Sequence, residues 1–182
     1  MDDRRLKEYA FKIYSGDSDY SLQKAFRLFP KYFSKIAFYY TEILVQKQKE
    51  LNTRMFQALG IDIAVKIKKI VDDTNKKVDL FRTKAINDIR KLDEYEKMVL
   101  SFEDKNIIKF LFPGIHKKEK EILTDINNVG QALSESFRDV VQIANYFGFN
   151  NIFKEAARGL VDSKNLISEL RDAIKLIKKG VI

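Results

Sequence analysis

The sequence predicts an all-α protein: an elongated antiparallel helical bundle of about five or six helices with one very long central helix. Residues 61–112 contain no glycine and no proline. Apolar side chains in this stretch return every three or four residues, which places them on one face of a helix. At about 1.5 Å per residue, a helix of this length would exceed about 60 Å, which is too long for a compact globule.

The other elements are bounded by glycine and proline. Glycines stand where helices can end, at Gly16, Gly60, Gly114 and Gly148. Pro30 suits the first turn of a helix. We expect six helices, near residues 2–14, 20–29, 31–59, 62–112, 116–147 and 151–179. Tight connections at Gly60 and at Pro113-Gly114 favour antiparallel neighbours.

The long fourth helix has two weak points. Residues 72–75, Asp-Asp-Thr-Asn, are poor helix formers, and Ser101 followed by Asp104 has the pattern of a capping box that can restart a helix. Whether the helix continues through them is left open by the sequence.

The third helix is apolar around more than half of its circumference. Phe38 and Tyr39 lie beside the stripe that runs through Phe33, Tyr40 and Leu44. We expect this helix to be central in the bundle or bound to a partner. In the last two helices, glycines at 130 and 159 would allow close helix approach at some cost in stability.

Length and composition favour one domain over residues 1–182, with no internal repeat and no flexible linker. The absence of cysteine excludes disulfides and thiolate chemistry, and is typical of a reducing compartment. The charged amino terminus does not have the pattern of a signal peptide. The most apolar window, residues 36–45, is far shorter than the roughly 18 residues of a transmembrane helix. We therefore expect a cytoplasmic protein.

The formal net charge of +8 is spread along the chain. Basic clusters that could contact a polyanion comprise Lys66, Lys68, Lys69, Lys117, Lys118, Lys175, Lys178 and Lys179. Acidic residues are interspersed throughout, which is more typical of solvated helix faces than of a dedicated phosphate-binding surface. Nucleic-acid binding through a diffuse basic surface is therefore the alternative function, and binding to an anionic membrane surface is the third.

Residues 143–151 resemble a helix-turn-helix only in their turn. A small residue, a glycine four positions later and a polar cap suit a tight corner between two helices. A DNA-reading head also needs a short first helix, whereas the preceding helix is expected to begin near His116. An ordinary helix corner is the favoured interpretation.

Catalytic patterns are scarce. His116 is the only histidine, and it suits an exposed helix start better than an acid-base role. The acidic pairs Asp72-Asp73 and Glu94/Glu96 do not share a helix face, so they favour solvent over a metal. No phosphate-binding loop or nucleophile motif is present. We expect no enzyme activity, no cofactor, no metal and no small-molecule substrate.

The run of residues 107–112 ends in Phe110, Leu111 and Phe112 beside the expected turn at Pro113. These three side chains are the candidate partner contact, although the short N-terminal helices could instead fold over them. The sequence therefore predicts a non-enzymatic helical binding or scaffold protein that acts through protein-protein contacts and self-associates.

Overall fold

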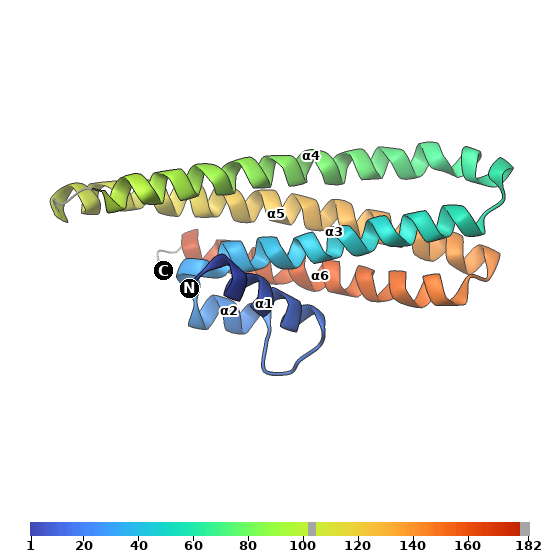
Figure 1. Cartoon of the computed structure of the whole chain (residues 1–182), viewed down its shortest axis with the longest axis horizontal. Coiled ribbons are helices and arrows are strands. Elements are labelled where there is room, and N and C mark those ends of the chain that lie inside the picture. The colour runs from blue at the N-terminus through green and yellow to red at the C-terminus, as the bar shows by residue number, and fades with distance from the viewer. Residues whose placement is uncertain (102–104, 179–182) are drawn as a thin grey trace.

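Figure 1 shows the computed structural model as an elongated bundle of antiparallel helices. The structure describes the backbone of residues 1–101 and 105–178, and the side chains of residues 1–98, 101 and 117–177. The described part of the chain contains six α-helices, one short 3-10 turn and no strand. The elements are α1 (Asp3–Tyr14), α2 (Leu22–Leu28), η1 (Pro30–Tyr32), α3 (Phe33–Ala58), α4 (Ile61–Leu100), α5 (Lys105–Phe147) and α6 (Asn150–Lys178). The predicted fold class is confirmed.

The four long helices α3 to α6 form the body of the bundle, and α1 and α2 pack against one side of α3. Helix α5 packs against α3, α4 and α6, whereas α4 lies along α5 and approaches α3 only sparsely. Buried apolar side chains from all six helices join in one core. The expectation that the aromatic-rich third helix is central is confirmed, because α3 contacts α1 and α2 as well as α5 and α6.

The predicted end of the long helix at Phe112 is wrong. Helix α4 ends at Leu100, and α5 begins at Lys105 and continues through Pro113 and Gly114. Of the two weak points, residues 72–75 stay helical and the Ser101 segment ends α4. A proline inside a helix removes one backbone hydrogen bond. Helices α4 and α5 pack closely along the described part of their length. Tertiary contact supplies most helical stability in proteins, so it can outweigh the local preference of a proline.

The corner between α5 and α6 is an αL turn at Gly148, whose φ is +73°. The Phe149 N–H donates to the Ala144 carbonyl at 2.8 Å, and the Gly148 N–H donates to Asn145, as expected for a Schellman-type helix end. The two helices then run antiparallel along each other. The interpretation of residues 143–151 as an ordinary helix corner is confirmed.

Helices α5 and α6 approach closely at Gly159. A methyl group at this position would lie 2.5 Å from Cε1 of Phe137, whose ring is fully buried against the glycine. At Gly130 the nearest atom would be Cγ1 of Ile167, at 3.2 Å. The predicted role of both glycines in close helix approach is confirmed.

Within the described residues, no helix combines the length and the apolar character needed to cross a bilayer.

Candidate protein-binding groove

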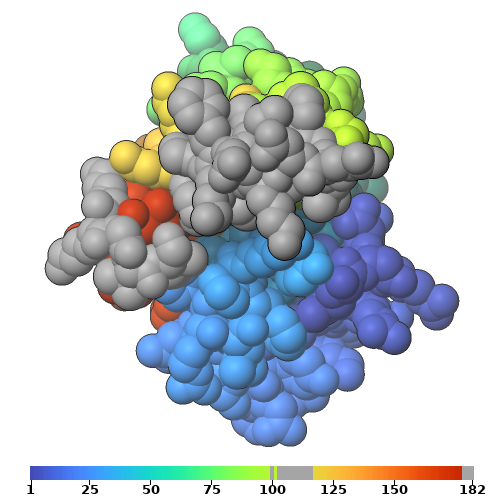
Figure 2. Space-filling model, turned by 90° about the vertical axis from the view of Figure 1, so that its left-hand side faces the viewer, coloured from blue at the N-terminus to red at the C-terminus, as the bar shows by residue number. Residues whose placement is uncertain are grey.

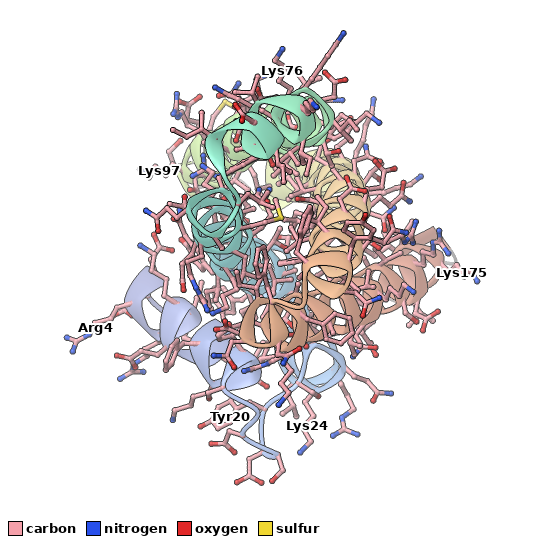
Figure 3. All side chains as sticks on the ribbon, turned by 90° about the vertical axis from the view of Figure 1, so that its right-hand side faces the viewer. Arg4, Tyr20, Lys24, Lys76, Lys97 and Lys175 are labelled. Atoms are coloured by element: carbon pink, nitrogen blue, oxygen red, sulfur yellow. The ribbon has the colours of Figure 1, made fainter. Side chains whose placement is uncertain are left out.

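A groove of about 540 Å³ runs along the outer face of α3, between α1 and α4. Figure 3 views the molecule along the bundle, with α1 at the lower left, α4 at the top and α3 between them. From the opposite end, Figure 2 shows α1 in dark blue on the side of the molecule below α4 in green. The groove is lined by Lys7, Phe11, Phe38, Tyr39, Glu42, Ile43, Gln46 and Ile86.

The floor and lower wall of the groove are apolar. Phe38, Tyr39 and Ile43 come from the outer face of α3 and are half-buried against the core. Phe11 of α1 is 59% exposed, which is a large fraction for a phenylalanine that packs beside other apolar groups. Ile86 of α4 completes the opposite wall. The arrangement leaves an apolar strip open to solvent.

The α3–α4 side of the groove is held by ion pairs instead of apolar packing. Arg82 donates to both carboxylate oxygens of Glu42, at 2.7 and 2.8 Å, and Lys35 contacts Asp93 at 2.6 Å. Because the Arg82–Glu42 pair is bidentate, it fixes the orientation of the two side chains relative to each other. These ion pairs bridge α3 and α4, which approach each other only sparsely. The groove lies beside this sparse contact.

A buried polar layer lies where α3, α4 and α5 meet. The Gln48 amide donates to Asn75 and, at 2.8 Å, to the Ser136 hydroxyl, and the Asn52 amide donates to the same Asn75 oxygen at 3.1 Å. Buried polar groups are costly unless they are hydrogen-bonded. Because one Asn75 oxygen serves both amides, the layer specifies how α3 and α4 are aligned along their axes.

Two carboxyl groups meet across the α4–α5 seam. Asp125 is 3% exposed, and burial together with its hydrogen bond to Asp88 raises the pKa of Asp125 to about 7. Lys84 lies 3.4 Å from the Asp125 carboxylate, and its positive charge lowers the pKa of Asp125 and so offsets part of this rise. We expect the pair to share one proton, because two neighbouring carboxyl groups favour the form in which one of them is neutral. Farther along the seam, burial and the nearby Glu96 raise the pKa of Glu119 to about 7.

The predicted basic clusters lie at opposite ends of the bundle. Thr74 faces Asp139, and Asp88 faces Asp125, which sets the antiparallel register of α4 and α5. In this register Lys117 lies roughly 30 residues along α4 from Lys66, or about 45 Å. Lys68 and Lys69 accompany Lys66, whereas Lys118 and Lys175 lie towards the other end, where α5 begins and α6 ends (Figure 1). The clusters do not combine into one surface.

Several predicted site residues have side chains that lie outside the described residues. They are Phe110, Leu111, Phe112, His116, Lys178 and Lys179. The candidate partner contact at residues 110–112 therefore stays a prediction. Among the described residues, no three acidic or histidine side chains form a group that could hold a metal ion.

The chain matches no family model, no curated protein and no solved structure, so its function is argued from this geometry. Only part of the groove could be predicted from the sequence. The aromatic excess on the third helix, at Phe38 and Tyr39, is the signal that indicated a further contact surface. Phe11 and Ile86 lie outside the apolar stripes of their helices, and a single apolar residue on a polar face did not by itself indicate a contact surface.

Proposed function

We propose that the protein is a non-enzymatic binding protein whose groove receives an apolar helical segment of a protein partner. The observation that carries the proposal is the open apolar strip formed by Phe11, Phe38, Ile43 and Ile86 between two helical walls. An amphipathic helix that lays its apolar face into such a groove is a common mode of peptide recognition.

The size of the groove suits a short helical segment. The lining residues of α3 run from Phe38 to Gln46, a little over two helical turns, or about 12 Å. A helix of three to four turns would place apolar side chains at i, i+3 or i+4, and i+7 along this strip. The half-buried Phe38 and Ile43 would become the centre of the contact, where well-packed side chains contribute most of the binding energy.

The separation of the basic clusters supports protein binding ahead of the nucleic-acid alternative. A duplex in contact with Lys66 and Lys117 together would have to span about 45 Å of the bundle, over a surface that also carries carboxylates. Self-association is one form of the protein-binding proposal, with the second copy as the source of the segment.

A fluorescence anisotropy titration tests the proposal. The probe is a labelled 18-residue helical peptide with leucines at i, i+3, i+4 and i+7 and an uncharged Gln/Ser polar face. We expect saturable binding that weakens at least about fivefold in Phe11→Ser and in Ile86→Ser, since each variant loses part of the roughly 1.5–3 kcal/mol that burial of a large apolar side chain contributes. The matched control is Leu80→Ser, because Leu80 is 67% exposed and lies outside the groove lining.

Equal binding to the two groove variants and to the Leu80 variant would contradict the proposed groove, as would no binding at all. Light scattering on the same samples separates self-association from binding of another protein. A concentration-dependent dimer that Phe11→Ser disperses would identify the second copy as the occupant.

A further inference from the structure

We propose that the partner segment is an acidic amphipathic helix, recognised by three cations on the rim of the groove. This inference rests on the proposed function and names the chemistry of the partner. The three cations are Lys7 on α1 and Arg90 and Lys97 on α4. They stand on the two opposite walls, so a helix seated between them would meet positive charge on both sides.

The positions of these cations follow from the helices that carry them. Lys7 lines the groove itself, with its ammonium group 5.2 Å from the centre of the Tyr39 ring. Arg90 and Lys97 follow Ile86 at i+4 and i+11, which places them on the same face of α4 as Ile86. They lie about 6 Å and about 16 Å farther along the helix, beyond the lining of the groove but within the length of an 18-residue helix. In Figure 3, Lys97 lies on the same side of the molecule as α1.

Most of the other charges around the groove are paired: Arg82 with Glu42, and Arg4 with Glu8 at 3.3 Å. Lys35 is shared by two carboxylates, Asp93 at 2.6 Å and Asp3 at 3.9 Å, so one negative charge partly offsets the three cations. By contrast, Lys7, Arg90 and Lys97 take part in no ion pair within the described part of the chain. Glu94 lies about 80° around α4 from Ile86, so it faces away from the groove axis. The groove therefore carries an unbalanced positive rim over an apolar floor.

This charge pattern selects among the occupants that an apolar groove could take. A second copy of this chain carries a net charge of +8 and would bring further positive charge to the same rim, which is unfavourable. A planar anionic membrane also suits the cations, but a flat surface fits a groove between two helical walls less well than a helix does. An acidic amphipathic helix can place apolar side chains on the floor of the groove and carboxylates beside the cations of the rim.

The experiment compares three labelled 18-residue peptides that share the leucine seam and differ only in a Glu-rich, Gln-rich or Lys-rich polar face. Anisotropy titrations at about 50 mM and about 500 mM salt measure the affinity of each peptide for the 182-residue chain. We expect the Glu-rich peptide to bind about tenfold more tightly than the Gln-rich peptide at low salt, because three partly exposed ion pairs each contribute modestly. The difference should shrink at high salt.

The variant Lys7→Gln/Arg90→Gln/Lys97→Gln should lose this preference while it keeps its affinity for the Gln-rich peptide. The matched control is Lys69→Gln/Lys76→Gln/Lys154→Gln, which removes the same charge from exposed positions outside the groove lining and should keep the preference. Equal loss in both triple variants would show a general charge effect and overturn the inference.

The outcomes separate this inference from the proposed function. If the Gln-rich peptide binds at the groove but the Glu-rich peptide binds no better, the acidic partner is wrong and the groove stands. If none of the peptides binds, the proposed function itself fails. A third outcome would point to a membrane. If the wild type binds phosphatidylserine vesicles more strongly than the rim variant does, and the Glu-rich peptide binds no better than the Gln-rich peptide, the ligand is an anionic membrane and not an acidic helix.

Discussion

At the scale of single residues, Gly159 shows how one position sets the distance between two helices. Its missing side chain leaves room for the Phe137 ring, the aromatic group that fills the α5–α6 core at this level. The Ser163 hydroxyl donates to the Gly159 carbonyl at 2.8 Å, one turn farther along α6. The Phe137 ring therefore packs against the Gly159 backbone, and the Ser163 hydroxyl of the same helix bonds to its carbonyl group.

We expect Gly159→Ala to lower the free energy of unfolding by about 1–3 kcal/mol, because the added methyl group overpacks the core against a ring that has no room to retreat. The higher helix propensity of alanine, about 1 kcal/mol, offsets part of that cost. In Gly130→Ala the nearest atoms belong to the flexible Ile167 and Leu166 side chains, so the same propensity gain should leave stability nearly unchanged. Urea denaturation of both variants measures the difference, and similar losses would argue against the rigid contact at Phe137.

The Asp88–Asp125 pair makes stability depend on pH. In the unfolded chain Asp125 ionises near its ordinary pKa of 3.8, whereas in the folded protein it keeps its proton up to about pH 7. The folded state therefore binds more protons between these two values, so the free energy of unfolding falls as the pH rises from about 4 to about 7 and levels off above it.

Asp125→Asn should reduce this fall, since the amide can still donate to Asp88 but carries no titrating proton. Thermal unfolding at pH 5 and pH 8 measures the change in melting temperature for each protein. The control is Asp73→Asn, at an exposed position on α4, which should keep the wild-type difference. The same pH difference in Asp125→Asn as in the wild type would exclude the shared proton.

At the scale of elements, the boundary between α4 and α5 was misplaced by about ten residues. The pair Pro113-Gly114 has the stronger local signal for a turn, and Ser101 with Asp104 the weaker one. The structure ends α4 at the weaker signal because the position of the turn sets which residues of α4 and α5 face each other. With the turn there, Thr74 meets Asp139 and Asp88 meets Asp125 across the seam.

Pro113→Ala tests this boundary. Because Pro113 lies in the interior of α5, alanine restores a backbone donor and should raise the free energy of unfolding by about 1–3 kcal/mol. If Pro113 instead formed the turn between two helices, the substitution would be neutral or slightly destabilising. Its main effect would then be to increase the conformational entropy of the unfolded chain. Chemical denaturation of the variant decides between the two, and a loss of stability would favour the boundary at Phe112.

The α3–α4 seam could not be predicted from helix patterns. Gln48, Asn52 and Asn75 each occupy a position that an amphipathic pattern assigns to the border of an apolar stripe. Their hydrogen bonds to one another depend on which helices are neighbours and in what register. Residues from different helices meet only once the topology is decided, and periodicity within one helix carries no information about that.

At the scale of the whole molecule, shape and charge act together. The bundle is long because its helices are long, and it is narrow because only a few of them lie side by side. Of its predicted basic clusters, Lys66, Lys68 and Lys69 lie towards one end of the bundle and Lys117, Lys118 and Lys175 towards the other, whereas Lys7 lines the groove. This division is the reason why we place partner recognition at the groove and not at the lysine clusters.

The sequence by itself determined the all-α class, the helix count, the central place of the third helix and the close approach at Gly130 and Gly159. These properties follow from local periodicity, residue size and backbone preference, which are readable within one segment. Only the tertiary structure decided where the long helix ends, which polar residues pair across helices and where an apolar strip remains open. Phe11 and Ile86 become neighbours of Ile43 because α1 and α4 both flank α3, and contacts between helices that are far apart in the sequence depend on how the whole chain packs.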